Sequence, residues 1–593
     1  MTRAPHPQAA FQRAATLYRQ GELQAAEKHC LQALKQQPRS VPGLHLVAAI
    51  KLRLGKAVEA IEAFDRLLAI DPKNAEALNH RGAALQQALR LKEARASFEA
   101  ALRLRPAYPE ALANLATVLS ELDEPVEALV RIDRALELGG PSAINFAIKA
   151  GILAALKRED EALAMYDKAL AIDPRSPLVM AYRANLLHQT GRIEEAVSAY
   201  ERLLAADPAR AYAAGALVDA KLTGCDWAGL ERATGDILRR IGKGEPAAHP
   251  FSLLWYCDDP GLQLRSAEIY AAREWLRPQQ RTPAIAARRR DRMRLAYLSG
   301  DFQEHPVAFG FAGLFERHDR ARFEIVALSY GPDDGSEMRR RIGGAVDRFV
   351  DLRAYGLDET VAAIRDLEID IVVDLAGFTG GGRGGNRGAV LAHRVAPLQV
   401  NHQGFGTGAS FFDYIVCDHV TAPDRLRPFY REKVVRLPDC SLPTDVSQPI
   451  APLTTNRAAE GLPERGFVFC CFNTSHKILP SIFNVWMRLL LAVPGSVLWL
   501  RERNASMVRR LRDEARSRGV AEDRLAFAKR TTLADHLARH QLADLFLDTS
   551  PFGAHTTGWH ALLAGLPFIT IRGESFASRA SASLLVSAGL AEL

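Results

Sequence analysis

The chain has 593 residues, of which 48% are hydrophobic and 24% are charged, with a formal net charge of +7. These proportions are typical of folded proteins and argue against a disordered chain, and the length allows several domains. The charge is a small excess for a chain of this size, so it does not by itself indicate a nucleic-acid-binding protein.

The seven cysteines are scattered along the chain, and no two of them form a Cys-x-x-Cys pair. This pattern argues against a disulfide framework or a cysteine-bound zinc site and fits a reducing compartment. The N-terminal residues lack the pattern of a signal peptide, and no apolar stretch approaches the roughly 18–20 residues that a membrane span needs. We therefore expect a cytoplasmic protein with no membrane partner.

A repeat with a 34-residue step occupies the first third of the chain. Each copy carries an alanine, a mostly bulky residue and a leucine, four residues apart, and most copies end in a proline. The alanine column is Ala26, Ala60, Ala94, Ala128, Ala162 and Ala196; the leucine column is Leu34, Leu68, Leu102, Leu136, Leu170 and Leu204; the proline column is Pro38, Pro72, Pro106, Pro174 and Pro208.

The four-residue spacing places these columns on one face of a helix. The alanine allows two helices to approach closely, and the proline ends the second helix. Copies of such a unit must stack to bury their apolar faces, which produces a superhelix. The pattern resembles the tetratricopeptide repeat, in six copies over residues 5–208. Such an array holds a peptide or protein in its groove or serves as a rigid scaffold, and the repeat alone does not decide between the two.

Residues 209–290 depart from the 34-residue step and are predicted to form a helical linker region. The region runs into a basic segment, composed of Arg288, Arg289, Arg290, Arg292 and Arg294. This segment lacks the interleaved aromatic residues that single-strand-binding proteins use. We therefore interpret it as a solvated linker surface and expect no nucleic-acid partner.

Strands and helices alternate after this region, which predicts parallel sheets covered on both faces. A first lobe is predicted at residues 291–442, an interdomain linker at 443–465, and a second lobe at 466–593. Strands are predicted at 294–299, 323–330, 370–375, 395–400, 414–417 and 433–437, and at 467–472, 496–500, 525–527, 545–547 and 567–571. The predicted fold is thus an α-helical tetratricopeptide superhelix followed by two doubly wound α/β lobes. Two such lobes form the GT-B plan of nucleotide-sugar glycosyltransferases, in which ligands lie beyond the carboxyl ends of the strands.

The segment His-Thr-Thr-Gly at 555–558 follows a predicted strand and opens a helix. Its hydroxyls and free backbone N–H groups could bind a pyrophosphate, or its threonines could simply cap the helix. Lys477 also follows a predicted strand, where a cation could neutralise a diphosphate leaving group; the alternative is an ordinary surface lysine. His305, after the first strand of the first lobe, is a candidate for orienting the acceptor or aiding proton transfer, although a lone histidine is usually structural.

A cofactor or metal site is not predicted. The glycines at 380–382 and 384–385 follow a strand but do not form a dinucleotide-binding fingerprint. No Asp-x-Asp pair, the usual holder of Mg²⁺ or Mn²⁺ in metal-dependent sugar transferases, occurs in the chain. Its absence favours a metal-free mechanism in which Lys477 and a helix N-terminus supply the positive charge.

Residues 292–593 resemble the catalytic region of protein O-GlcNAc transferases, and the preceding repeats suit the architecture of that family. The motifs lie at 299–306 (Ser-Gly-Asp-Phe-Gln-Glu-His-Pro), 328–335, 396–399, 472–477 (Phe-Asn-Thr-Ser-His-Lys), 541–549, 555–558 and 573–579. The resemblance implies an inverting, metal-independent transfer of GlcNAc from UDP-GlcNAc to Ser or Thr hydroxyls of proteins bound by the repeat groove.

The resemblance also implies roles for individual residues. Lys477 would contact the diphosphate, Thr556 and Thr557, beside His555, would hold phosphate oxygens, His536 would lie against the uracil with Arg539 nearby, and His305 would lie at the junction of sugar and acceptor. Thr474 stands where the animal enzymes have a glutamine near the diphosphate and sugar.

The chain departs from the animal family at several of these positions. His560 replaces an aspartate for a ribose hydroxyl, Gly404-Phe-Gly-Thr-Gly408 replaces a loop near the sugar, and Leu533 replaces a lysine. The column that matches the asparagine ladder of the groove is Gln12, Leu46, His80, Asn114, Ile148 and Tyr182. The chain ends at Leu593, where family members continue with further helices, so a C-terminally truncated chain is expected. Two alternatives therefore stay open: another donor sugar, such as fucose or glucose, or a non-catalytic interaction scaffold.

Overall fold

The computed structural model describes residues 7–276, 285–286, 289–379, 387–402 and 405–593. Contacts divide the chain into two compact units. The first consists of Met1–Val179 with Ala354–Ala362, and the second of Met180–Arg353 with Ala363–Leu593. The first unit therefore ends inside the predicted array of residues 5–208, and the last repeat segments belong to the second unit.

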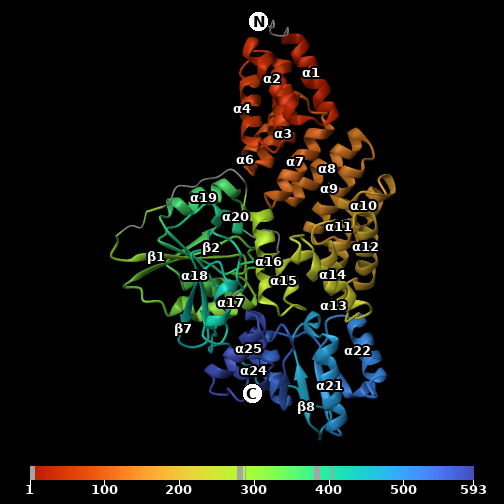
Figure 1. The fold of residues 1–593 in the computed structure, drawn as a ribbon, viewed down its shortest axis with the longest axis vertical. Helices are drawn as coiled ribbons and strands as arrows, with labels where there is room; N and C mark the ends of the chain where they lie inside the picture. The colour runs from red at the N-terminus through yellow and green to blue at the C-terminus, as the bar shows by residue number, and fades with distance from the viewer. Residues whose placement is uncertain (1–6, 277–284, 287–288, 380–386, 403–404) are drawn as a thin grey trace. The chain divides into compact units, whose positions relative to one another are not determined.

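The first unit is built from pairs of antiparallel helices, drawn from red to orange in Figure 1. Its helices are α1 (Pro7–Gln20), α2 (Leu23–Gln36), α3 (Val41–Arg53), α4 (Ala57–Leu68), α5 (Ala75–Gln87), α6 (Leu91–Leu104), α7 (Pro109–Glu121), α8 (Pro125–Gly139), α9 (Ala143–Ala155), α10 (Glu159–Ile172) and the start of α11 (Pro177–Gln189). Three alanines that recur at the 34-residue step, Ala26, Ala60 and Ala94, are fully buried. Gly55 joins two helices with a φ of 75°, a left-handed conformation that glycine adopts without strain.

The second unit begins with helices that the sequence predicted as the end of the array and a linker. These are α12 (Ile193–Ala206), α13 (Ala213–Thr223), α14 (Leu230–Gly242), α15 (Pro250–Leu253) and α16 (Pro260–Tyr270), followed by a π-helical turn at Ala271–Trp275. Residues of α14 and α15 share one hydrophobic cluster with residues of both lobes, among them Ile237, Leu253, Phe405 and Phe576. The segment that follows the array is therefore an integral part of the core of this unit.

The first lobe holds a seven-stranded parallel sheet in the order β3-β2-β1-β4-β5-β6-β7. The strands are β1 (Met293–Ser299), β2 (Phe323–Ser329), β3 (Arg348–Asp351), β4 (Ile371–Asp374), β5 (Leu398–Asn401), β6 (Tyr414–Asp418) and β7 (Lys433–Leu437). The helices are α17 (Pro306–Glu316), α18 (Glu337–Gly344), α19 (Leu357–Asp366) and α20 (Gly388–Ala392). Figure 1 shows this sheet in green.

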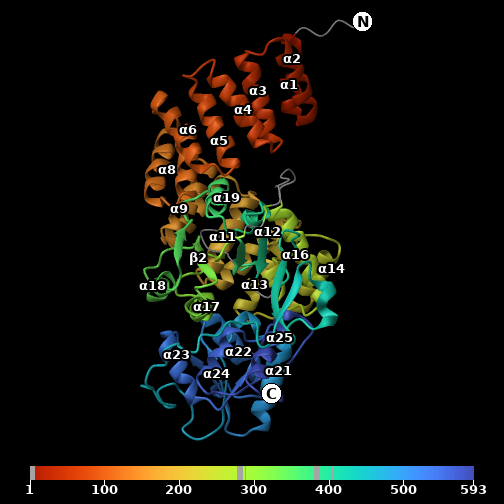
Figure 2. The same cartoon turned by 90° about the vertical axis from the view of Figure 1, so that its left-hand side faces the viewer.

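The second lobe holds a five-stranded parallel sheet in the order β10-β9-β8-β11-β12. The strands are β8 (Val468–Cys471), β9 (Val497–Arg501), β10 (Leu525–Ala528), β11 (Leu545–Leu547) and β12 (Phe568–Ile569). The helices, in blue in Figure 2, are α21 (Pro480–Ala492), α22 (Ala505–Ser517), α23 (Leu533–Arg539), α24 (Thr556–Leu563) and α25 (Phe576–Ser587). Trp486, Trp499, Phe472 and Phe546 fill its core.

The order of a helical repeat array and two parallel-sheet lobes confirms the predicted fold class. The segment 443–465 runs between the lobes and contacts both: Asp445 forms an ion pair with Arg341 at 2.7 Å, and Arg457 forms one with Asp544 at 2.9 Å. No helix among the described residues is long and apolar enough to cross a membrane.

Candidate functional site

The site forms at the carboxyl ends of two neighbouring strands of the second lobe. β8 ends at Cys471 and continues into Asn473, Thr474 and Lys477, while β11 is followed by the segment that leads to α24. Because β8 and β11 are paired in the sheet, the loops that follow them meet. Asn473 ties them together: its Nδ2 donates to Asp548 Oδ1 at 3.1 Å and to Thr549 Oγ1 at 2.8 Å.

Lys477 is a half-buried cation at this edge of the sheet. Its Nζ donates to the carbonyl oxygen of Gly553 at 2.7 Å and lies 3.8 Å from the ring centre of Phe552. Burial lowers the pKa of Lys477 to about 8, and the charges of Asp548 and Cys471 oppose that shift. The side chain is thus held in place as a positive charge with little solvation, unlike an ordinary surface lysine.

The start of α24 lies beside Lys477. His555 occupies the N-cap position without a side-chain capping hydrogen bond, so Thr556 and Thr557 lie inside the first turn and do not cap the helix. Thr557 Oγ1 donates to Asn473 Oδ1. Burial lowers the pKa of His555 to about 3, with a smaller effect from Lys477, so its imidazole is neutral. An uncapped helix N-terminus next to a half-buried cation can bind an anion such as a diphosphate.

The first lobe reaches the start of α24 through the loop after β5. The ring of Phe405 stacks on His555, with centroids 5.9 Å apart and an interplanar angle of 20°. Phe405 also packs against Phe576 at 5.4 Å, and Thr407 Oγ1 donates to the buried Glu432 at 2.6 Å. The described part of the loop 404–408 therefore lies beside the start of α24. Its place near a sugar is what the family resemblance implies, and Gly404 and the glycines of 380–385 lie outside the described residues.

His305 lies at the carboxyl end of the first lobe's sheet, where it is the N-cap of α17. Its Nδ1 accepts a hydrogen bond from the backbone N–H of Val307 at 3.3 Å and lies 3.7 Å from Asp301 Oδ2. A neutral imidazole whose Nδ1 accepts carries its proton on Nε2. None of the contacts found for the described residues joins His305 directly to Lys477 or α24, so its place opposite the second lobe stays a prediction.

Three further predicted residues lie on the segment after β8 or on α23. Thr474 Oγ1 lies 2.8 Å from His476 Nε2, and the ring of His536 packs against Phe472 with centroids 5.0 Å apart. Burial lowers the pKa of His536 to about 2, so this imidazole is neutral as well. Arg539, at the end of the same helix α23, donates to the carbonyl oxygen of Lys529 at 2.8 Å.

His560 lies on α24, one turn after Thr556. It is 6% exposed, and its Nε2 is buried without a hydrogen-bond partner among the described residues. Burial lowers its pKa to about 4, with a smaller effect from His540. This ring nitrogen is enclosed by neighbouring side chains, so a ligand hydroxyl could bond to it only after those side chains move.

Sequence reasoning missed a group of three arginines beside this site. Arg501, Arg503 and Arg530 line a pocket of about 330 Å³, together with Asn473 and Thr474. Residues 188–191, at the end of α11 and in the turn that follows it, form another wall of this pocket. Burial lowers the pKa of Arg501, and the charges of Arg503, Arg530 and Arg539 add to that effect. Glu502 also lines the pocket, but no ion pair to a carboxylate is found for these three arginines in the described part of the chain, so the three cations outnumber the one anion and the pocket favours anions. The only signal in the sequence was the position of Arg501 and Arg503 after a predicted strand.

Comparisons with known proteins identify the relatives of this chain. A family model described as "Glycosyl transferase family 41" matches residues 276–448 and 441–593, which together are more than half of the chain. Tetratricopeptide-repeat families match residues 48–109 and 153–218.

Two curated relatives are named as transferases of N-acetylglucosamine to peptides. The chain is 34% identical over 362 residues to a probable UDP-N-acetylglucosamine–peptide N-acetylglucosaminyltransferase of Arabidopsis thaliana, which covers 58% of this chain and 37% of the relative. It is 25% identical over 497 residues to the corresponding Caenorhabditis elegans protein, with 62% of this chain and 43% of the relative covered. The chain thus spans less than half the length of these relatives.

A solved structure extends the similarity to the whole architecture. A mutant of the Thermobaculum terrenum O-GlcNAc transferase superposes with a TM-score of 0.60 at 26% identity, over 82% of this chain and 86% of that one. This coverage includes both the repeats and the lobes, in agreement with the predicted GT-B plan. The chain therefore belongs to glycosyl transferase family 41, as a member in which tetratricopeptide repeats precede the transferase region.

Proposed function

We propose that this protein transfers GlcNAc from UDP-GlcNAc to Ser or Thr hydroxyls of other proteins. The observation that carries the proposal is the half-buried Lys477 beside the uncapped start of α24. A diphosphate fits this pair of positive groups, and the curated relatives are named for a UDP-N-acetylglucosamine donor and a peptide acceptor.

The diphosphate would lie between Lys477 and the first turn of α24. Thr556 and the backbone N–H groups of that turn would bind phosphate oxygens, with Thr557 held in place by Asn473. When the bond between sugar and diphosphate breaks, Lys477 would stabilise the charge that develops on the leaving group. Since the chain contains no Asp-x-Asp pair, we propose that these groups act without a metal ion or other cofactor.

The nucleoside would extend from α24 toward α23. His536 and Arg539 border that direction, in line with the roles that the family resemblance implies for them. His560 Nε2, which has no partner in the described structure, would bond a ribose hydroxyl in place of the aspartate of the animal enzymes. Thr474 and the three arginines would border the donor on the side of the 330 Å³ pocket.

The acceptor hydroxyl would attack the anomeric carbon as the bond to the diphosphate breaks, in a single displacement that inverts this centre, and the hydroxyl proton would pass to an oxygen of the departing diphosphate. Since Nδ1 of His305 contacts the backbone N–H of Val307, its Nε2 is left to contact an acceptor or sugar oxygen. His305 would therefore orient the acceptor. Replacement of His305 by Ala should lower the rate of transfer at least tenfold and leave the Kd of UDP unchanged; loss of UDP binding alone would contradict this placement.

The repeat array would bind the protein substrates in its groove. Of the column predicted to line that groove, Asn114 donates through Nδ2 to Asn79 Oδ1 at 3.0 Å, and the other members are not asparagines. We therefore propose that substrate recognition by this array differs from an asparagine ladder. The seven free cysteines support a reducing compartment, and we propose the cytoplasm.

The test is a calorimetric titration of the purified chain with UDP and with GDP in the presence of a chelator. We expect saturable UDP binding that Lys477→Ala abolishes and that Lys243→Ala, an exposed lysine on the second unit, leaves unchanged. A preference for GDP would instead indicate a different donor, such as a fucose nucleotide. Binding of neither nucleotide would contradict the proposed function and favour an interaction scaffold.

A further inference from the structure

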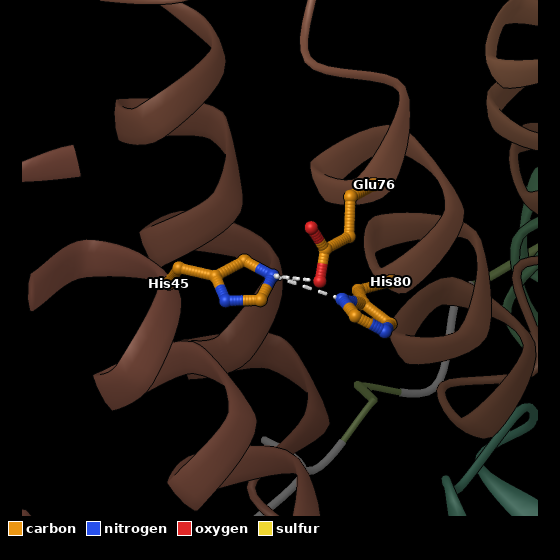
Figure 3. Close-up of side chains that lie close together, drawn as sticks. All are labelled: His45, Glu76 and His80. Atoms are coloured by element: carbon orange, nitrogen blue, oxygen red, sulfur yellow. Dashed lines mark hydrogen bonds and ion pairs between the residues drawn. The ribbon is translucent and has the colours of Figure 1, made fainter. Parts of the chain in front are cut away.

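Three potential metal ligands meet in the repeat array, away from the transferase site. His45 lies on α3, and Glu76 and His80 lie one turn apart on α5. Figure 3 shows that their side chains point toward one another from two adjacent helices. One ligand atom of each residue lies within 4.8 Å of the others.

The distances fit a single small ion. His45 Nε2 lies 2.9 Å from His80 Nδ1 and 3.9 Å from Glu76 Oε1. Two ligands at about 2.0–2.1 Å from a tetrahedral zinc ion are roughly 3.3 Å apart, which lies between these two distances. The third separation, between the ligand atoms of Glu76 and His80, is within 4.8 Å, so side-chain movements of roughly 1.5 Å would bring the three atoms to equal distances from one ion.

The repeat geometry produces this meeting. Positions 35 residues apart contact each other between the first helices of successive repeats, as in His45–His80 and again in Asn79–Asn114. The amide pair is joined by one hydrogen bond, and Glu110, at the first turn of α7, holds the same repeat position before Asn114 that Glu76 holds before His80. The histidine pair differs because both of its facing ring nitrogens can ligate a metal ion, and Glu76 Oε1 lies 3.9 Å from one of them.

The surroundings suit a site that is rigid at its base and open on one side. Both histidine rings rest on the fully buried Phe64, with ring centroids 5.9 Å and 6.1 Å away. The side chain of Glu76 is 64% exposed and that of His45 is 29% exposed, so an ion can enter from solvent. His80 belongs to the column predicted to line the groove.

We propose that His45, Glu76 and His80 bind a zinc ion in the repeat array. Two imidazole nitrogens and one carboxylate are a common zinc ligand set, and three protein ligands leave a fourth position for water or for a side chain of a bound protein. Coordination replaces the shared hydrogen bond between the two rings, and each ring then keeps its proton on the nitrogen that faces away from the metal.

The test uses the full chain, stripped of metal by a chelator and titrated with ZnCl₂ in a calorimeter. We expect one site per chain with a Kd of about 1 μM or tighter, and a rise in the melting temperature of the array when zinc is added. Replacing zinc by Co²⁺ should give the visible absorption of a tetrahedral cobalt site. Absence of binding by the wild-type chain would overturn the proposal.

Conservative variants separate coordination from a structural hydrogen bond. Glu76→Gln changes a mostly exposed side chain and should not affect folding, and His80→Gln can still hydrogen-bond to His45. Both should weaken zinc binding at least tenfold, whereas His29→Gln, a histidine of the same array outside the cluster, should bind as the wild type does. An unchanged zinc titration in both cluster variants would show that zinc binds elsewhere and would overturn the proposal.

Discussion

The role proposed for Lys477 predicts that UDP binding depends on pH. Burial lowers the pKa of this lysine to about 8, which is close to the pH of a binding measurement. A diphosphate would bind the protonated amine. As pH rises through this value the lysine loses its charge in the free protein, so UDP binding should weaken. From a pKa of about 8 we expect the Kd of UDP to be roughly tenfold higher at pH 9 than at pH 7.

The control for this dependence is Lys477→Arg, because a guanidinium keeps its charge throughout this pH range. UDP binding by this variant should be nearly independent of pH between 7 and 9, even if it is weaker overall. A wild-type Kd that does not change between these pH values would show that Lys477 does not contact the diphosphate.

His560 should recognise the ribose of the donor. In the described structure its Nε2 has no partner, and one new hydrogen bond contributes about 0.5–1.5 kcal/mol, or roughly 2–10-fold in affinity. The wild type should therefore bind UDP more tightly than the analogue that lacks the ribose hydroxyl bound by His560, which is either the 2′ or the 3′ hydroxyl. His560→Leu, which keeps much of the side-chain volume, should lose this discrimination in calorimetric titrations; equal discrimination in both proteins would contradict the role.

Among individual residues of the site, those that directly follow strands could be predicted from the sequence better than those that separate segments bring together. Lys477 and Thr557 could be predicted to lie near each other because loops after neighbouring parallel strands meet at one edge. The pocket of Arg501, Arg503 and Arg530 could not, because its walls come from separate segments that include residues 188–191. The unpartnered nitrogen of His560 is also a property of packing, which no spacing in the sequence reveals.

Among the elements, α25 depends on a residue far away in the sequence. Asp258, in the segment after α15, accepts hydrogen bonds from the backbone N–H of Glu574 at 2.8 Å and of Ser575 at 2.9 Å, and from Ser578 Oγ at 2.5 Å. It thereby caps the helix that closes the second lobe. Asp258→Ala should destabilise the second unit by about 2 kcal/mol, since it removes charge-assisted bonds to a helix N-terminus.

Limited proteolysis and thermal unfolding would measure this effect. The matched control is Asp259→Ala, which removes a cap of α16 instead: Asp259 Oδ1 accepts from Gly261 N at 2.7 Å and Leu262 N at 3.0 Å. Both variants should lower the melting temperature, but only Asp258→Ala should speed cleavage near residues 573–578. Equal cleavage in the two variants would show that the contact to α25 is not important.

The periodic elements were the most predictable. A 34-residue step determines the helix pairs of the repeats, because each column is a local pattern within one helix. The limits of some strands differ from the prediction. The strand β5 was expected to begin at Val395, but it begins at Leu398 because the preceding Pro397 has no N–H to donate to a neighbouring strand. The bond from Asp258 to α25 spans more than three hundred residues, and no local pattern predicts it.

Across the whole molecule, the order of the repeats and the two lobes could be predicted from the sequence, but the division into compact units could not. The last repeat helices belong with the lobes, since Glu194 of α12 forms an ion pair with Arg509 of α22 at 2.8 Å. Residues predicted as a linker contribute Trp255, which stacks on Phe552 at 4.9 Å beside Lys477. Periodicity is a local property, so it cannot show where an array begins to pack on another domain.

The proposed function is transfer of a sugar from UDP-GlcNAc to protein, so the most direct test is to measure that transfer. The full chain would be incubated with labelled UDP-GlcNAc, a mixture of acceptor proteins and a chelator, and label on Ser and Thr would be identified by mass spectrometry. We expect transfer by the wild type and by Lys243→Ala, and a loss of at least a hundredfold in Lys477→Ala. Equal transfer by Lys477→Ala would contradict the role of that lysine, and no transfer by a wild-type chain that binds UDP would contradict the proposed function.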